Sequence, residues 1–420
     1  MEEFKIRNVK AREVLDLRGL PTIEVDVVTD EGAMGRASAP GGTSIGNYEA
    51  LELRDGGDRY GGRGVRQAVQ NVNNIIAPKL VGKDVRRQRE IDTLMIQLDG
   101  TKNKSKLGGN TIYATSLSVA QAAAEAVGIP FYRYVGGVNC CTMPVPMLVA
   151  IHGGRAIGGN DLDFEDHIFV PIGAKSFSEA IQFGAEVYFE FRKVLQAKYG
   201  KSAVGSVAVT GTYVPPMKDE REALDSMMKA LQETGYADKF GLGLDATANS
   251  LYDQETSKYT FMGKKMNRGD LIEVYKDLVS TYPIISIEDP FAENDFEGFV
   301  EITRKLDIQI VGDDIFVTNV ERLMKGIEMG AANALLFKVN QVGTLSEALD
   351  AAECASRNGY GVEVSGRTGD AEDTTLADIT VGINAKQIKI GGLDKMFAKY
   401  NRFLRIEEQL GSLAKYPKEL

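Results

Sequence analysis

The feature that most constrains the fold is a series of apolar runs in the second half of the chain that each end in a charged or polar residue. The runs end at Asp245, Glu288, Asp313, Lys338, Ser365 and Lys389. From Glu288 onward the ends follow at intervals of 25, 25, 27 and 24 residues, the length of one strand and one helix. Repeated strand–helix units with nearly continuous apolar strands predict a parallel sheet covered by helices. This many units favour closure into a (β/α)8-type barrel.

The first third of the chain has a different pattern. Residues 9–39 alternate apolar and polar side chains in short runs broken by Gly and Asp, which predicts an antiparallel meander. Residues 110–128 are rich in alanine and end in Gly128 with a proline two residues later, which is typical of a helix and its stop signal. We therefore expect an α+β domain over 1–136 and the barrel over 137–420.

Composition excludes several classes of protein. Lys and Arg number 49 against 59 Asp and Glu, and the resulting net charge of −10 argues against nucleic acid or an anionic membrane surface as the main partner. Three cysteines are too few for a disulfide framework or a thiolate zinc site. The N-terminus lacks a secretory signal, and no apolar run approaches the ~18–20 residues of a membrane span. We expect a soluble cytoplasmic protein.

Histidine is also scarce. The chain has two histidines, His152 and His167. This scarcity weakens Ser-His-Asp chemistry and histidine-based zinc chemistry, because both need a placed imidazole. Carboxylates and lysines must therefore carry any chemistry.

The carboxyl ends of barrel strands meet at one mouth, so the charged strand ends should converge there. Asp245, Glu288 and Asp313 would offer three carboxylates to a hard divalent cation, and Mg²⁺ is the first expectation. The neighbouring Asp289 and Asp314 should point the other way, because side chains alternate across a strand, and should serve in salt bridges or helix caps. Beside a cation the neutral amine of Lys338 would be favoured, which makes this lysine a candidate general base.

A family resemblance extends over essentially the whole chain. The blocks that carry it are AREVLDLRGLPTIEVDV, EALELRD, PIISIEDPF, IVGDDIFVTN, LLFKVNQVGTLSEAL, EDTTLADITVG, QIKIGG and KYNRFLRIEEQLG. With these blocks the sequence resembles the enolase (phosphopyruvate hydratase) family. The resemblance implies an N-terminal α+β capping domain, a modified (β/α)8 TIM-type barrel, dependence on Mg²⁺ and a homo-oligomer, commonly a dimer. It also implies a small phosphorylated carboxylic acid as substrate.

The resemblance assigns roles to individual residues. Asp245, Glu288 and Asp313 match the family's magnesium ligands, and Lys338 matches the base that removes the proton beside the substrate carboxylate. A lysine base that works beside magnesium is an established pattern of the enolase superfamily and comes to this chain through the resemblance. The cation would stabilise the dianionic carboxylate that forms as the proton leaves.

On the substrate side, Lys389 matches the lysine that contacts the carboxylate, and Arg367 matches the phosphate-binding arginine. Ser365 opens the same segment, SGRTG. The glycine-rich segment APGGTSIGNYEA resembles a lid over the site, in which Ser44 falls where a second magnesium ion is bound.

The departures from the family pattern fall at the chemistry. The family's general acid aligns with Thr210, whose hydroxyl is too weak an acid to protonate a departing hydroxide. Within SGRTG the phosphate-side histidine is Gly366 and the following serine is Thr368. A helper glutamate aligns with Asp166, the first lid serine is Gly41, and the family's flexible-loop histidine has no counterpart. This chain therefore resembles a divergent member that lacks several catalytic residues.

Replacement groups and alternative functions follow from these departures. His152, Arg155, His167 and Asp166 lie in the altered loop region and could supply replacement side chains. Four functions stay open: an enolase that interconverts 2-phosphoglycerate and phosphoenolpyruvate, an enolase paralogue that acts on a different phosphorylated or phosphonylated carboxylic acid, a catalytically silent enolase-like binding protein, and a sugar-acid dehydratase. Retention of the metal carboxylates and lysines argues against the silent protein. Arg367 and Lys389 disfavour the dehydratase.

Overall fold

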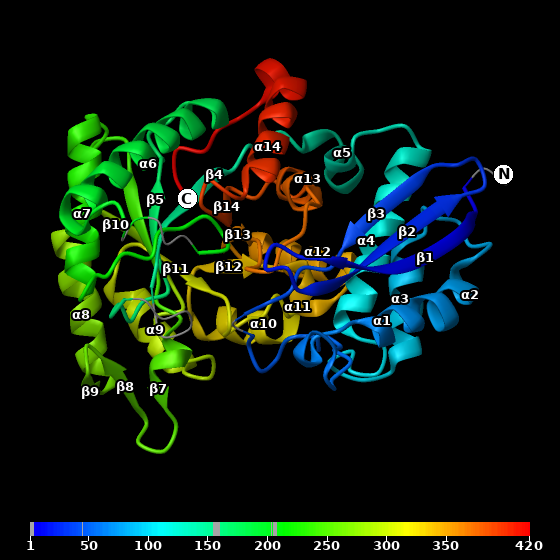
Figure 1. Cartoon of the computed structure of the whole chain (residues 1–420), viewed down its shortest axis with the longest axis horizontal. Helices are drawn as coiled ribbons and strands as arrows, with labels where there is room; N and C mark the ends of the chain where they lie inside the picture. Colours follow the sequence, from blue (N-terminus) through cyan, green and yellow to red (C-terminus); the bar gives the residue numbers. More distant parts are fainter. Residues whose placement is uncertain (1–3, 44, 154–159, 203, 205–207) are drawn as a thin grey trace.

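The computed structural model describes residues 4–43, 45–153, 160–202, 204 and 208–420. The N-terminal part lies against one side of a larger barrel (Figure 1). No helix in the described part of the chain is long and apolar enough to cross a membrane.

The N-terminal part is a three-stranded antiparallel sheet in the order β1-β2-β3, packed on helix α4. The strands are β1 Ile6–Leu15, β2 Pro21–Thr29 and β3 Met34–Ser38. The helices are α1 Arg66–Asn71, α2 Ala77–Leu80, α3 Gln88–Asp99, α4 Gly109–Ala126 and α5 Phe131–Gly136. The predicted meander and the predicted alanine-rich helix are both present.

Helix α4 packs directly against the sheet at Gly35 of β3. Gly35 on β3 has no room for a side chain, since a Cβ there would collide with the Ser118 carbonyl oxygen and the Ala122 nitrogen. Ser118 also donates a 2.8 Å hydrogen bond to the Val25 carbonyl of the central strand. The small residues of α4 therefore allow the helix and the sheet to pack closely.

The rest of the chain forms a closed eight-stranded barrel in the order β10-β11-β12-β13-β14-β4-β5-β6. The strands are β4 Val145–His152, β5 Asp166–Val170, β6 Gly241–Asp245, β10 Ile284–Glu288, β11 Gln309–Gly312, β12 Ala334–Phe337, β13 Gly361–Ser365 and β14 Gln387–Gly391. A small antiparallel sheet of β7 Tyr252–Asp253, β8 Lys258–Phe261 and β9 Lys264–Met266 projects from it. The predicted α/β barrel fold is confirmed.

Helices surround the barrel (Figure 1). They are α6 Phe177–Tyr199, α7 Glu220–Thr234, α8 Arg268–Thr281, α9 Phe296–Lys305, α10 Val320–Met329, α11 Val339–Val342, α12 Leu345–Arg357, α13 Thr375–Gly382 and α14 Phe397–Leu410. Several begin at a capping side chain, as at Ser176 of α6 and Asp219 of α7. Helix α5 packs on α13 and joins the two parts of the molecule.

One strand differs from the all-parallel sheet that the strand–helix pattern predicts. Strand β5 runs antiparallel to both of its neighbours, β4 and β6. The segment between β4 and β5 contains no described helix that could carry the chain back across the barrel, so β5 returns directly beside β4. This reversal is consistent with the modified barrel that the family resemblance implies.

Alternation along the strands explains which side chains reach the mouth. On β12, Ala334 and Leu336 lie in a small cluster apart from the main core, whereas Leu335 and Phe337 belong to the main core outside the barrel. Lys338 continues the row of Ala334 and Leu336 and therefore turns inward. The same alternation places the other strand-end residues over the barrel interior.

Candidate active site

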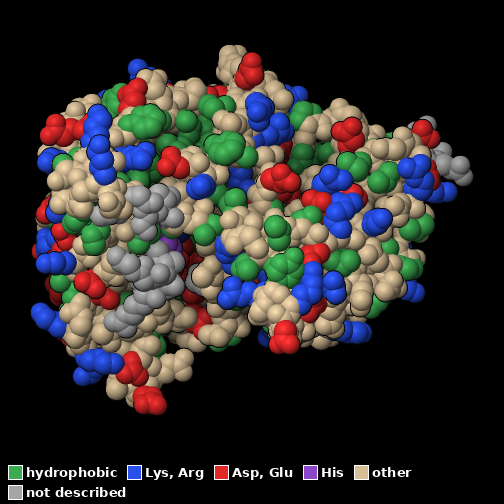
Figure 2. Space-filling model, viewed as in Figure 1, with side chains coloured by type: hydrophobic (Ala, Val, Ile, Leu, Met, Phe, Trp, Pro, Cys, Tyr) green, Lys and Arg blue, Asp and Glu red, His purple; other side chains and the backbone are tan. Residues whose placement is uncertain are grey.

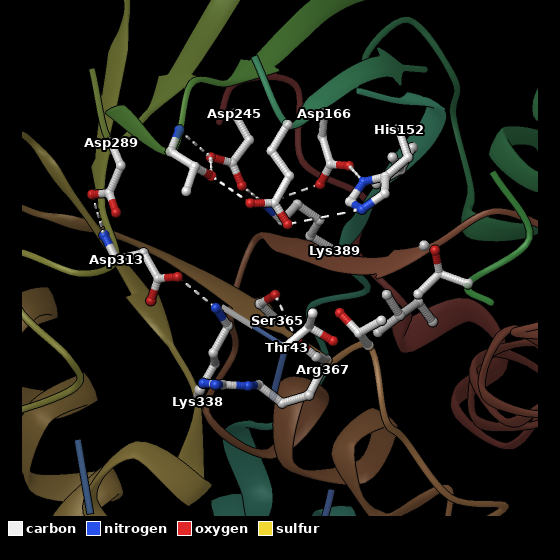
Figure 3. Close-up of a pocket in the computed structure, with 18 of the residues that line it drawn as sticks. Thr43, His152, Asp166, Asp245, Asp289, Asp313, Lys338, Ser365, Arg367 and Lys389 are labelled. Carbon is white, nitrogen blue, oxygen red and sulfur yellow. Dashed lines mark hydrogen bonds and ion pairs between the residues drawn. The ribbon is translucent and has the colours of Figure 1, made fainter. Parts of the chain in front are cut away.

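A cavity opens at the carboxyl ends of the parallel strands, and Thr43 from the N-terminal part contributes to its wall (Figure 3). Acidic and histidine side chains are visible in a hollow on the face drawn in Figure 2. Nearly all predicted site residues line the cavity: Asp166, Thr210, Asp245, Asp313, Lys338, Ser365, Gly366, Arg367, Thr368 and Lys389. Glu288 is buried beside Lys389, and Ser44 lies outside the described residues.

Lys389 on β14 joins two of the predicted metal carboxylates. Its ammonium lies 2.7 Å from Asp245 Oδ2 and also donates a hydrogen bond to Glu288. Asp245 and Glu288 face each other in register on the adjacent strands β6 and β10. Burial alone would lower the pKa of Lys389, but the charges of Asp245 and Glu288 outweigh it and raise that pKa well above its ordinary value. The two carboxylates therefore favour the charged form of Lys389.

Lys338 follows β12 and pairs with the third predicted carboxylate. Its Nζ lies 2.5 Å from Asp313 Oδ2, and Asp313 Oδ1 accepts a 2.7 Å hydrogen bond from the Gln341 amide. Burial acts to lower the pKa of Lys338, but the Asp313 carboxylate raises it above the ordinary lysine value. The amine is thus held charged by Asp313 in this structure. For Lys338 to act as a base, a positive charge nearby must offset the Asp313 carboxylate and favour the neutral amine.

A second group of carboxylates shares Asp313. Among the described residues, Asp289, Asp313 and Asp314 place carboxylate oxygens within 4.8 Å of one another. Asp289 accepts hydrogen bonds from the backbone N–H groups of Asp313 at 2.9 Å and Asp314 at 2.8 Å. These bonds are to the backbone after β11, whereas the sequence predicted a salt bridge or a helix cap for Asp289. Its closeness to Asp313 differs from the expected outward direction, because a φ of +40° turns the chain directly after β10.

The donor set fits a hard divalent cation. Burial, together with neighbouring carboxylates, raises the pKa of Glu288 and of Asp289 well above ordinary values and raises that of Asp314 to about 8. Burial is the largest cause of these raised pKa values, and the neighbouring negative charge adds to it. Oxygen ligands in surplus negative charge are what Mg²⁺ prefers. The predicted ligands Asp245, Glu288 and Asp313 and the alternative cluster around Asp289 both stay open from this geometry.

Arg367, the residue predicted to bind phosphate, lines the cavity. It follows β13, and its Nη1 donates a 2.9 Å hydrogen bond to Oε2 of Glu49 from the N-terminal part. Both side chains are buried, with 5% and 4% of their areas exposed. Gly42 passes over the guanidinium so closely that a Cβ on this glycine would collide with it. Glu49 and Gly42 of the N-terminal part thus both contact Arg367 of the barrel.

Strand β4 contributes an imidazole on the other side of the cavity, and β5 and the residue before it contribute two carboxylates. His152 Nδ1 lies 2.7 Å from Asp166 Oδ1, and its Nε2 lies 4.0 Å from Glu165. Although burial lowers the pKa of His152, the bond to Asp166 and the nearby carboxylates raise it to about 9. Thr210 lines the same wall. His152 is therefore a cation at neutral pH.

The remaining candidates for replacement groups do not reach this wall. His167 is fully buried, with Nε2 2.6 Å from Glu220 Oε2, and does not line the cavity. Arg155 lies outside the described residues. His152 and Asp166 are thus the two candidates that the described structure brings into the cavity.

Sequence reasoning missed Glu165, Thr247 and Glu49. Thr247 donates hydrogen bonds to Glu165 at 2.7 Å and to Asp245 at 2.9 Å. Thr247 follows a strand-end aspartate by two residues, and this spacing is typical of an Asx turn that could have identified it. Glu49 lies 318 positions from Arg367, and no local pattern connects them.

A barrel with carboxylates, lysines and an arginine at its mouth defines an enzyme that combines a cation site with anion-binding residues. Residues 140–419 match the model of the enolase C-terminal TIM barrel domain, and residues 6–135 match that of the enolase N-terminal domain. The chain belongs to the enolase family.

Three relatives illustrate the similarity, and each is a protein named Enolase. The protein from Pyrococcus furiosus is 57% identical over 419 residues, covering 98% of this chain and 97% of the relative. Those from Thermococcus kodakarensis and Methanocaldococcus jannaschii are 56% identical over 420 residues and 55% identical over 417 residues. Each of these two matches covers 99% of this chain and 97% of the relative.

Proposed function

We propose that this protein is a magnesium-dependent carbon–oxygen lyase of the enolase type that dehydrates 2-phosphoglycerate to phosphoenolpyruvate. The observation that carries the proposal is the meeting of Lys338, Lys389 and Arg367 with the strand-end carboxylates in one cavity. The near full-length similarity to proteins named Enolase supports it.

Each of these residues has a separate role in the reaction, set by its position in the cavity. The Arg367 guanidinium binds the substrate phosphate, and the Lys389 ammonium faces the substrate carboxylate. Lys338, which follows β12, two strands from β14 in the barrel, removes the proton on the carbon beside that carboxylate. Asp245, Glu288 and Asp313 would hold Mg²⁺. When bound, Mg²⁺ supplies positive charge that stabilises the substrate carboxylate as the proton leaves and favours the neutral amine of Lys338.

A spectrophotometric assay of phosphoenolpyruvate formation tests the proposal. The wild-type protein should convert 2-phosphoglycerate only when Mg²⁺ is present, and Lys338→Ala should lower the rate by on the order of 10³-fold. Lys265→Ala is a matched control, because Lys265 is an exposed lysine paired with Asp253 on the small outer sheet. Full activity in the Lys338 variant, or none in the wild type, would refute the proposal.

A second candidate is an enolase paralogue for a different phosphorylated or phosphonylated carboxylic acid. It is favoured by the small side chains on the phosphate side, where Gly366 and Thr368 line the cavity. Such a protein would exchange the acidic proton of 2-phosphoglycerate with D₂O without forming phosphoenolpyruvate. Mass spectrometry of the recovered substrate separates the two functions. A silent protein would show neither exchange nor turnover.

We further propose a cytoplasmic homo-oligomer, a dimer or larger, that takes a small phosphorylated acid and neither nucleic acid nor a membrane as partner. The net charge of −10 supports the exclusion of anionic partners. Light scattering of the purified protein tests the assembly, and a mass equal to one chain of 45.7 kDa would contradict it.

A further inference from the structure

The proposed dehydration needs a proton donor as well as a base. Hydroxide is a poor leaving group near neutral pH, so the departing oxygen must receive a proton as its bond to carbon breaks. The donor must reach the substrate from a different direction than Lys338, which takes a proton in the same reaction. The described cavity lining offers few groups that meet both conditions.

Most polar groups of the lining are excluded by their chemistry or contacts. The hydroxyls of Thr210 and Thr368 are too weakly acidic. The Lys389 ammonium is held between Asp245 and Glu288 and has a pKa well above its ordinary value. The acidic groups beside Asp313 lie on the same side of the cavity as Lys338.

His152 is the imidazole that lines the described cavity. It ends β4, which lies three strands from β12 around the ring of eight, so it faces Lys338 across the mouth (Figure 3). The backbone holds it there, because His152 N donates to the Tyr213 carbonyl and Tyr213 N donates to the Ala150 carbonyl, both at 2.9 Å. These bonds also tie His152 to the segment that carries Thr210.

The contacts of the ring leave one nitrogen directed at the cavity wall. Nδ1 lies 2.7 Å from Asp166, which fixes the orientation of the imidazole. Nε2 lies 4.0 Å from Glu165, beyond hydrogen-bond distance. The carboxylates that face the ring are Asp166 of β5, Glu165 before it and Asp245 of β6, and together they favour the charged imidazolium.

We propose that His152 is the catalytic acid of this enzyme, held by Asp166 and directed at the leaving hydroxyl of the substrate. This role rests on the proposed dehydration. In the step, the Lys338 amine takes the proton from the carbon beside the carboxylate, and the electron pair of that C–H bond becomes part of the new carbon–carbon double bond. The C–O bond breaks with its pair on oxygen, and the His152 Nε2 proton converts that hydroxide into water. Exchange with solvent returns a proton to His152 and removes one from Lys338.

Separate measurement of the two half-steps tests this role. His152→Gln should lower the rate of phosphoenolpyruvate formation by about 10²-fold or more, while exchange of the acidic proton of 2-phosphoglycerate with D₂O changes by less than about threefold. Equal loss of both rates would assign His152 a structural role and overturn the proposal. If His152→Gln forms phosphoenolpyruvate at the wild-type rate, the proposed role of His152 is also overturned. The proposed function of the protein would then still stand.

Two further variants guard against a folding defect and a rival donor. Glu165→Gln tests the rival donor, because Glu165 lines the same wall and lies beside the ring. If Glu165→Gln loses dehydration and His152→Gln keeps it, Glu165 is the acid and the proposal fails. Thr210→Glu places a carboxyl on the same wall and should restore at least about tenfold of the rate lost in His152→Gln. If the double variant with His152→Gln and Thr210→Glu retains proton exchange but regains no dehydration, the role of His152 is contradicted. If the wild-type protein shows no turnover, the proposed function is refuted together with this role.

Discussion

At the scale of single residues, the site is governed by the pairing of buried charges. Each lysine that the proposed chemistry needs is held by a carboxylate, Lys338 by Asp313 and Lys389 by Asp245 and Glu288. Such pairs are costly to break, because a buried charge without its partner keeps its full desolvation penalty. His152 is likewise paired with Asp166, and this pairing shifts the pKa of the imidazole.

The raised pKa of His152 predicts a pH-dependent contribution to stability. Burial opposes the shift, but Asp166 raises the pKa from 6.5 to about 9, so the folded protein binds the proton more tightly than the unfolded chain. The stabilisation is therefore fully present below pH 6.5 and is lost as the pH rises through about 9. The difference in free energy of unfolding between wild type and His152→Gln should shrink by about 2–3 kcal/mol over that window.

Urea denaturation of both proteins at several pH values measures this difference. Comparison with the variant removes contributions from the many other titrating groups, which both proteins share. A difference that stays constant with pH, or grows, would show that Asp166 does not stabilise the imidazolium.

At the scale of elements, Gly41 and Gly42 after β3 pack against the residues around Arg367. Gly41 forms an isolated antiparallel bridge with Gly369, and the Arg18 guanidinium donates a 3.0 Å hydrogen bond to the Gly42 carbonyl. The segment is thereby fixed over Arg367. Glycine is required at 42 by this close approach, since a larger residue would occupy the place of the guanidinium.

Gly42→Ala should therefore displace Arg367 and weaken phosphate binding. We expect KM for 2-phosphoglycerate to rise by about tenfold, as for loss of one charged hydrogen bond, with a smaller change in kcat. Gly269→Ala near the start of α8 is the control, because its Cβ would meet only a side-chain oxygen at 3.2 Å. Steady-state kinetics measure both constants. An unchanged KM in the position 42 variant would mean that Arg367 does not bind the substrate.

Much of the element pattern could be predicted from the sequence, but its exceptions could not. The intervals between strand ends predict the barrel because a strand buried on both faces is almost continuously apolar, as in β12. The reversed direction of β5 could not be predicted in this way. All five of its residues are buried, and a wholly buried strand has the same pattern whether it runs parallel or antiparallel to its neighbours. The position of Lys389 at the mouth follows from the end of its apolar run, whereas its place between Asp245 and Glu288 depends on contacts across three strands.

At the scale of the whole molecule, the site depends on both parts of the chain. Glu49 of the N-terminal part pairs with Arg367 of the barrel, and Lys104 pairs with Glu347 at 2.7 Å. The first of these pairs is almost fully buried and stands in the cavity wall. Stability and substrate affinity should therefore be coupled through it.

Glu49→Gln tests that coupling. The buried Arg367 guanidinium loses a charged partner, so the free energy of unfolding should fall by about 2 kcal/mol, and KM should rise because the guanidinium is less well placed. Asp350→Asn is the control, because the pair of Asp350 with Arg89 also joins the two parts but is exposed. Equal, small effects of both variants on unfolding and on KM would contradict the coupling.

The central claim is that Asp245, Glu288 and Asp313 share one Mg²⁺ opposite Lys338. A crystal structure of the protein with Mg²⁺ and 2-phosphoglycerate tests it most directly. The account predicts one ion with an oxygen of each of these three carboxylates at about 2.0–2.1 Å, and the Lys338 amine directed at the acidic carbon. An ion held instead by Asp289, Asp313 and Asp314, or a Lys338 side chain turned away from the substrate, would contradict it.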